Sequence, residues 1–175
     1  VSKPEIDNAA EILNDLREYV ITSLRQTGKS GEAKDGMDIS LICWFKDQNV
    51  VDFAGANNPL YLIRDGKLIE HKGDKMPIGI HTENKPFTSK KIEIKKKDSV
   101  YMFSDGYADQ FGGPKGKKLK YKPFKKLLLE NSNEKMLKQK IELDEKIEAW
   151  KNYIDPVTNE PFEQVDDIVI VGVRF

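Results

Sequence analysis

The sequence has little cysteine, no long apolar run and no excess of charge of either sign. Cys43 is the single cysteine among 175 residues, so a disulfide within one chain is excluded. No apolar stretch approaches the ~20 residues that a transmembrane helix needs. The chain also opens without a signal-peptide pattern. We therefore expect a cytoplasmic protein that does not insert directly into a membrane.

The charge balance limits the classes of partner. Lysine and arginine number 29, as do aspartate and glutamate, so no global field steers the chain toward nucleic acid. Seven lysines fall between Lys115 and Lys126, with Tyr121 and Phe124 among them, a pattern that superficially suggests nucleic-acid binding. Without a recognised binding motif, we interpret them as a solvated loop and helix face and predict no nucleic-acid partner. A patch that meets an acidic or phosphorylated protein is the alternative.

Hydrophobic periodicity predicts a helix in the first 27 residues, with an apolar stripe at Ile12, Leu16, Tyr19, Val20 and Leu24. Ser2 with Glu5, or Asp7, would cap its start. Strands are expected at residues 39–45, 50–54, 60–64, 67–70, 87–94 and 99–103. The Asp65-Gly66 pair between the third and fourth strands suits a type I′ turn, and the fifth and sixth should pair around residues 95–98.

Helices are expected next, at residues 124–129 and 136–150, before a last strand at 168–173 that is apolar enough to be buried on both faces. Strands and helices are thus largely segregated along the chain. This order favours an α+β layered domain over a doubly wound α/β fold.

Two acidic turns adjoin apolar strands. Asp105 follows the strand at 99–103, and Asp166 directly precedes the strand at 168–173. A carboxylate at the tip of a rigid strand is held in a fixed position, as a metal ligand must be. If the two strands are neighbours, Asp105 and Asp166 can converge on one hard cation such as Mg²⁺ or Mn²⁺. Ordinary turn chemistry is the alternative for each aspartate taken alone.

Other polar features have simpler interpretations. Asp38 lies in an acidic turn, where we expect it to satisfy backbone donors. The small residues at 54–59 indicate close approach of another backbone or a ligand, or plain packing. His71 and His81 lack the spacing of a zinc site, and we expect both at the surface.

Five strings in order resemble the SpoIIE-like branch of the metal-dependent (PPM-type) serine/threonine phosphatases. They are residues 35–38 (Asp-Gly-Met-Asp), 54–60 (Ala-Gly-Ala-Asn-Asn-Pro-Leu), 76–79 (Met-Pro-Ile-Gly), 104–110 (Ser-Asp-Gly-Tyr-Ala-Asp-Gln) and 164–168 (Gln-Val-Asp-Asp-Ile). The resemblance covers essentially the whole chain. It implies that residues 1–175 are the C-terminal part of one phosphatase domain, an antiparallel β-sandwich flanked by helices with its N-terminal strands missing.

The resemblance also implies roles for residues. Asp105 and Asp166 match metal ligands of the family, and Asp109 matches a carboxylate that some members use for a weaker third metal. The implied reaction is hydrolysis of phosphoserine or phosphothreonine by a metal-activated water, with two Mn²⁺ or Mg²⁺ ions in a complete site. The implied substrate is a phosphorylated regulatory protein, such as a STAS-type anti-anti-sigma factor.

One departure from the family pattern limits these expectations. The family's upstream Asp-Gly and Gly-His-Gly motif does not occur in the 175 residues. We therefore expect a truncated catalytic domain that is nearly inactive alone, whose parent can be tethered to a membrane sensor domain. We also expect an exposed sheet edge that favours dimerisation. The alternative is a non-catalytic interaction module of the same fold.

Overall fold

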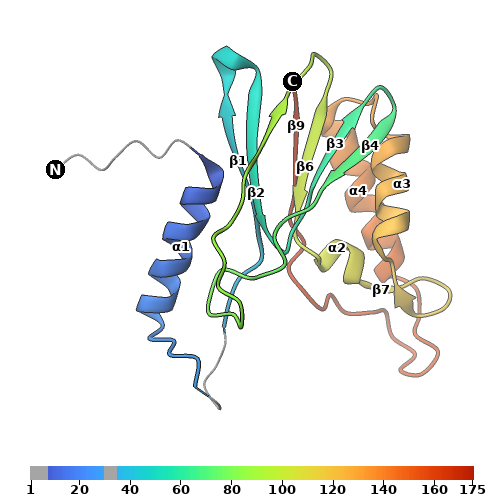
Figure 1. Cartoon of the computed structure of the whole chain (residues 1–175). Coiled ribbons are helices and arrows are strands. Elements are labelled where there is room, and N and C mark those ends of the chain that lie inside the picture. Colours follow the sequence, from blue (N-terminus) through green and yellow to red (C-terminus); the bar gives the residue numbers. More distant parts are fainter. Residues whose placement is uncertain (1–7, 30–34) are drawn as a thin grey trace. The chain divides into compact units, whose positions relative to one another are not determined.

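The computed structural model describes residues 8–29 and 35–175, which belong to two compact units (Figure 1). Unit 1 contains the described residues up to Tyr61, together with Glu70–Lys96 and Phe175. Unit 2 contains Leu62–Ile69 and Lys97–Arg174. Among the described residues no helix is both long and apolar enough to cross a membrane.

Unit 1 is built on a three-stranded antiparallel sheet in the order β1-β2-β5. Its strands are β1 (Ile39–Phe45), β2 (Val50–Ala56) and β5 (Lys90–Glu93), and a 3₁₀ turn, η1 (Lys46–Gln48), joins the first two. Helix α1 (Ala9–Ser23) contacts β1 and β2. Its N-cap is Asn8, whose side chain accepts a hydrogen bond from the backbone N–H of Glu11. The caps predicted at Ser2, Glu5 and Asp7 lie outside the described residues.

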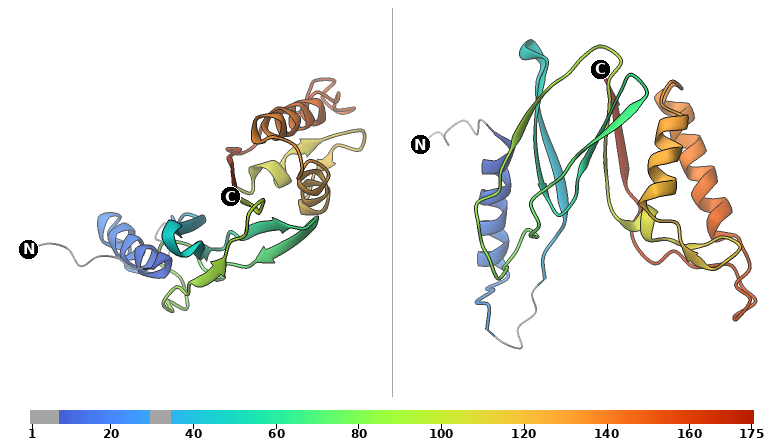
Figure 2. Two further views of the ribbon diagram at one scale, coloured as in Figure 1. Left: turned by 90° about the horizontal axis from the view of Figure 1, so that it is seen from above. Right: turned by 45° about the vertical axis from the view of Figure 1, so that its right-hand side comes forward.

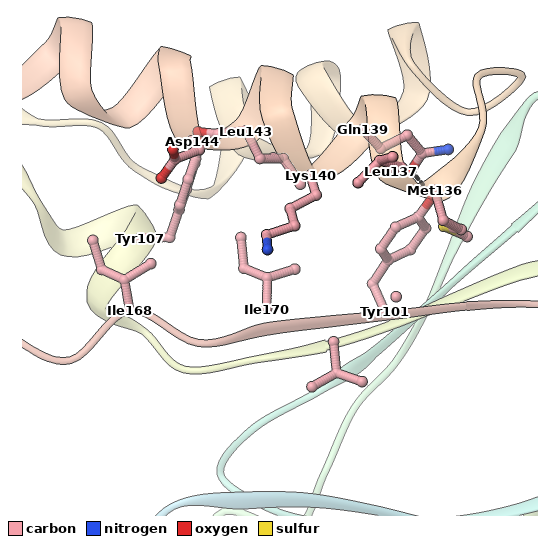
Figure 3. Close-up of a pocket in the computed structure, with 12 residues that line it drawn as sticks. Tyr101, Tyr107, Met136, Leu137, Gln139, Lys140, Leu143, Asp144, Ile168 and Ile170 are labelled. Atoms are coloured by element: carbon pink, nitrogen blue, oxygen red, sulfur yellow. Dashed lines mark hydrogen bonds between the residues drawn. The ribbon is translucent and has the colours of Figure 1, made fainter.

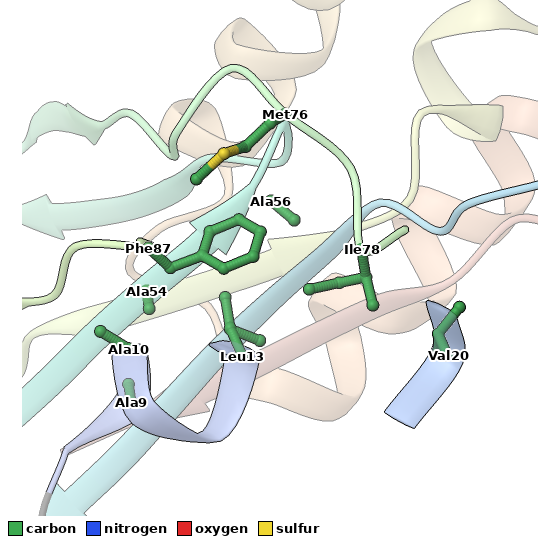
Figure 4. Packing of buried hydrophobic residues seen from close by; sticks show 9 residues of the cluster. All are labelled: Ala9, Ala10, Leu13, Val20, Ala54, Ala56, Met76, Ile78 and Phe87. Atoms are coloured by element: carbon green, nitrogen blue, oxygen red, sulfur yellow. The ribbon is translucent and has the colours of Figure 1, made fainter. Parts of the chain in front are cut away.

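The buried face of α1 differs from the predicted stripe. Small and apolar residues of α1 pack against residues of β2 and of the loops of unit 1 in one cluster (Figure 4). Its members are Ala9, Ala10, Leu13, Val20, Ala54, Ala56, Met76, Ile78 and Phe87. Tyr19 and Leu24, predicted in the stripe, are 71% and 55% exposed. Arg17 takes a place on the buried face because its Nη1 donates to the Lys85 carbonyl (2.7 Å) and its guanidinium stacks on Phe87.

Unit 2 contains a four-stranded sheet in the order β4-β3-β6-β9. The strands are β3 (Leu60–Arg64), β4 (Lys67–His71), β6 (Ser99–Phe103) and β9 (Ile170–Arg174). The first two residues of β3 and the last two of β4 belong to unit 1. A small hairpin, β7 (Phe111–Gly112) and β8 (Lys117–Lys118), and three helices, α2 (Gly106–Asp109), α3 (Tyr121–Glu130) and α4 (Met136–Lys151), complete the unit. Figure 2 shows α3 and α4 side by side from two further directions.

The coarse fold prediction is confirmed: helices accompany antiparallel sheets in a mixed α+β fold. The β3–β4 turn has positive φ at Asp65 (48°) and Gly66 (70°), as the Asp-Gly pair predicts. Two strand predictions are wrong. Strand β5 pairs with β2 rather than with β6. Strand β9 lies at the edge of its sheet, where Val171 in the strand and Val169 just before it are 44% and 54% exposed.

The sheet of unit 2 contains one ion pair with a buried carboxylate. Arg64 Nε lies 3.0 and 3.1 Å from the two carboxylate oxygens of Asp98, whose side chain is 2% exposed. Removing the cation leaves a buried charge without its partner, which is far more destabilising than loss of a surface pair.

We expect Arg64→Met to lower the free energy of unfolding by about 2–4 kcal/mol, because Asp98 then stays buried without its counter-ion. Urea unfolding followed by circular dichroism measures the loss. Lys67→Met, an exposed position on the same hairpin, is the matched control and should change stability by less than about 0.5 kcal/mol. Equal effects of the two substitutions would show that the pair contributes no more than a surface charge.

Candidate metal and phosphate site

The two strands that precede and follow the predicted metal ligands are neighbours in the sheet. Strands β6 and β9 pair antiparallel, with Phe103 opposite Ile170 and Met102 opposite Val171. The condition on which convergence of Asp105 and Asp166 depends is therefore met. Because Asp105 follows β6 and Asp166 precedes β9, this register places both aspartates beyond the same end of the strand pair.

Ser104 joins the two loops that leave these strands. Its Oγ donates to the carbonyl of Asp167 (2.7 Å) and accepts from the backbone N–H of Val169 (3.0 Å), while its own N–H donates to the Val169 carbonyl. At the next glycine the backbones are in direct contact, because a Cβ on Gly106 would lie 2.4 Å from the Asp167 carbonyl oxygen. The two loops are thus fixed against each other at residues 104–106 and 167–169.

The side chains of Asp105 and Asp166 are both exposed beside this contact. Asp105 is the N-cap of α2, and its carbonyl accepts from the Asp109 N–H at 2.9 Å. Asp166 Oδ1 accepts from the Asp167 N–H at 2.7 Å, and the carbonyl of Asp166 accepts from Gln164 Nε2 at 2.9 Å. Two solvent-accessible carboxylates on fixed loops fit a hard divalent cation.

The donor set around these two aspartates is partial. Within residues 8–29 and 35–175, no group of three or more histidine, cysteine, aspartate or glutamate side chains is placed to hold a metal ion. That Asp105 and Asp166 share one cation stays a prediction.

Asp109 has a partner that the sequence did not predict. Its Oδ2 accepts a hydrogen bond from Lys118 Nζ at 2.7 Å, and the two side chains are 39% and 43% exposed. A cation at Asp109 would meet this ammonium group first. An exposed pair of this kind is weak, about 0–1 kcal/mol, so Lys118 can be displaced.

The other three resembling strings lie together in unit 1. Met37 and Ile78 exchange two backbone hydrogen bonds of 3.0 and 2.8 Å, and Asn57 Nδ2 donates to Asp38 Oδ1 at 2.8 Å. Asp38 thus accepts from a side-chain amide, and its predicted role toward backbone donors stays a prediction. At Gly55 another backbone does pass close by, because a Cβ there would lie 3.1 Å from the Cα of Gly73.

The histidines of the chain differ in environment. His81 is exposed, as predicted, and its Nδ1 accepts from the Glu83 N–H. His71, predicted at the surface, is only 9% exposed at the end of β4. Neither belongs to a metal-binding group in the part of the chain that the structure describes.

A cavity of about 630 Å³ lies between α4 and β9 (Figure 3). Its lining is mainly apolar and includes Leu143, Ile168 and Ile170, with Lys140 and Asp144 as the charged members. Burial, with Asp144 adding a smaller effect, raises the pKa of Tyr107, whose hydroxyl donates to the Leu143 carbonyl. None of the three predicted metal ligands lines this cavity.

No specific feature of the sequence predicted this cavity. Met136, Leu137, Ile141 and Ile147 predicted only a helix with one apolar face. In the structure Leu137 and Ile141 are 70% and 48% exposed, and this pair at i and i+4 is the signal that could have indicated an open apolar surface.

Comparison with known proteins identifies a family for this chain. The family model described as Stage II sporulation protein E (SpoIIE) matches residues 4–175. No curated protein sequence gives a significant match.

Several solved structures share the fold. The SiaA-PP2C domain of Pseudomonas aeruginosa superposes with a TM-score of 0.72 at 22% identity, over 94% of this chain and 68% of that chain. The phosphatase domain of SpoIIE from Bacillus subtilis, presoaked with Mn, has a TM-score of 0.55 at 16% identity, over 99% and 76% of the two chains. The Ser-Thr phosphatase MsPP of Mycobacterium smegmatis, in complex with cacodylate, has a TM-score of 0.56 at 12% identity, over 97% and 75%.

We expect Ser104→Ala to lower the free energy of unfolding by about 0.5–1.5 kcal/mol, because it removes two exposed hydrogen bonds, whose Asp167 carbonyl and Val169 N–H then bond to water. The Val169 amide should also exchange its hydrogen faster, as measured by hydrogen-exchange NMR. Ser104→Thr keeps the hydroxyl and is the matched control. Unchanged protection of Val169 in the alanine variant would contradict the bridging role.

Proposed function

Because the chain belongs to the SpoIIE family of PP2C/PPM phosphatase domains, we propose that it contributes to metal-dependent hydrolysis of phosphoserine or phosphothreonine on a regulatory protein. The observation that carries the proposal is the fixed contact between the loops of Asp105 and Asp166. The proposed substrate is a phosphorylated protein of the STAS-type anti-anti-sigma class.

In this proposal Asp105 and Asp166 hold one Mn²⁺ or Mg²⁺ ion. Divalent ions in such sites lower the pKa of a bound water and neutralise phosphoryl oxygens. The chain's own part is positional. Ser104 and Gly106 set the spacing of the two loops. Both carboxylates are exposed and can therefore bind an ion from solvent.

Asp109 is proposed as a ligand of a weaker third ion. Lys118 neutralises this carboxylate in the structure, so the ion must compete with an ammonium group 2.7 Å away. This competition gives a physical reason for weak binding at Asp109, since the incoming cation gains less than it would at an unpaired carboxylate.

A second candidate function is a non-catalytic module that binds a regulatory partner without turnover. The observation in its favour is that the described residues contain no group of three or more potential ligands. The two candidates differ in their need for metal, since only the phosphatase requires Asp105 and Asp166 to bind it.

We expect the 175-residue chain to bind Mn²⁺, and Asp105→Asn or Asp166→Asn to weaken that binding by about tenfold or more, since each removes an anionic ligand. Isothermal titration and Mn²⁺ electron paramagnetic resonance measure the affinity. Asp65→Asn, an exposed aspartate in the β3–β4 turn, is the matched control with the same charge change. Equal Mn²⁺ affinity in all three variants would show that neither Asp105 nor Asp166 is a ligand of the ion.

Hydrolysis of a phosphoserine protein by the 175-residue chain should be nearly absent, because the described residues supply too few metal ligands. A longer protein that adds the upstream Asp-Gly and Gly-His-Gly motif should release phosphate only with Mn²⁺ or Mg²⁺. Phosphate release measured with and without a chelator compares the two. Strong metal-dependent turnover by residues 1–175 alone would show that the chain already holds a complete site.

A further inference from the structure

The lysines between Lys115 and Lys126 form one exposed surface of unit 2. They lie on the β7–β8 hairpin and the first turns of α3, where six are exposed and Lys125 is partly buried. Between Gly106 and Leu129 the only acidic residue is Asp109. We call this the basic surface, and its exposed members are Lys115, Lys117, Lys118, Lys120, Lys122 and Lys126.

In the part of the chain that the structure describes, two of the six exposed lysines pair with acidic residues. Lys118 pairs with Asp109, and Lys126 makes a weak i,i+4 contact of 3.5 Å with Glu130. The surface therefore keeps a strong local excess of positive charge, although the net charge of the sequence is zero. Fields of this kind act over about 8 Å at physiological salt, so the local excess matters more than the total.

The hairpin that carries these lysines is firmly anchored. Gln110 is fully buried, its Nε2 donates to the Glu163 carbonyl (2.8 Å), and its carbonyl accepts from Leu119 N–H and Trp150 Nε1. The Gly113 N–H donates to the Trp150 carbonyl at 2.9 Å. A surface held this way loses little conformational entropy when a partner binds.

The basic surface is continuous with the proposed site. Lys118 Nζ contacts Asp109, which lies one helical turn from Asp105 in α2. The backbone N–H of Lys120 also donates to the Ala108 carbonyl at 2.6 Å. A polypeptide that lies on the lysines would thus reach the loop of Asp105.

We infer that the basic surface docks an acidic segment of the phosphoprotein substrate and thereby directs its phosphorylated residue to the site at Asp105. This inference rests on the proposed function. The partner it fits is a protein whose phosphoserine or phosphothreonine is flanked by aspartate and glutamate. Opposite charges on two such faces increase the association rate and suppress uncharged competitors.

The two aromatic residues on this surface favour a protein partner over RNA. Single-stranded nucleic acid binds by stacking bases on exposed ring faces. Lys118 Nζ lies over the Phe111 ring, 5.8 Å from its centroid, and Tyr121 packs on Phe103 at 6.3 Å. Both rings are thus engaged within the chain, and their exposed parts, 38% each, suit apolar contacts with a protein.

Fluorescence anisotropy tests the inference without any need for turnover. Three labelled probes are compared. Acidic residues flank the phosphoserine in the first peptide, and glutamine and serine flank it in the second, which is otherwise identical. The third probe is a single-stranded uridine RNA of equal length. The acidic peptide should bind about tenfold tighter than the neutral one at low salt and lose this advantage at high salt.

The substitutions Lys115→Glu, Lys117→Glu and Lys122→Glu combined should weaken binding of the acidic peptide about tenfold. The matched control reverses three exposed lysines elsewhere, Lys90, Lys91 and Lys96, and should change binding less than about twofold. Equal binding of the acidic and neutral peptides, equal effects of the two triple variants, or tighter binding of the RNA would each overturn the inference.

Asp105→Asn separates this inference from the proposed function, because docking on lysines does not require the metal. The variant should keep its docking preference and lose metal-dependent hydrolysis in the longer protein. Docking without metal-dependent hydrolysis by the unsubstituted longer protein would count against the proposed function alone. Hydrolysis that proceeds equally well on both peptides, with no docking preference, would count against the basic surface alone.

Discussion

The hydroxyl of Ser104 connects two segments that lie 63 positions apart in the sequence. It donates to one loop and accepts from the same loop, so it fixes both distance and register at the end of the β6–β9 pair. Gly106 makes the contact tight, since any side chain there would collide with the Asp167 carbonyl. Every role assigned to Asp105 and Asp166 depends on this joint, because exposed carboxylates on independent loops would not stay close enough to act on one ion.

Features that depend on neighbouring residues could be predicted from the sequence. Strand β1 has the predicted bounds, and the Asp65-Gly66 turn adopts positive φ at both residues, because alternation and turn chemistry are local. The position of the metal-ligand candidates could also be anticipated. Asp105 lies in an acidic turn after one apolar strand, and Asp166 lies in another turn before the last strand. If the two strands pair, as β6 and β9 do, the two turns are predicted to lie at the same end of the sheet.

Features that depend on distant partners could not be predicted in this way. The buried face of α1 includes Arg17 because Lys85 and Phe87, far along the chain, satisfy its guanidinium, and no periodicity reports that. Strand β5 pairs with β2, which precedes it by more than 30 residues, and not with β6, which follows it directly, so nearness in sequence misled the pairing. The ion pair of Asp109 with Lys118 likewise could not be predicted, because it depends on the position of the β7–β8 hairpin.

The even charge count of this chain is a poor guide to its surface. Twenty-nine positive and 29 negative residues cancel in total, yet seven of the lysines gather between Lys115 and Lys126, on the hairpin and the first turns of α3. Screening limits each field to roughly the width of one such patch, so a partner responds to the patch it touches and not to the sum. A net charge of zero therefore argues against long-range steering of nucleic acid to this chain. It does not argue against short-range recognition of a protein face of complementary charge.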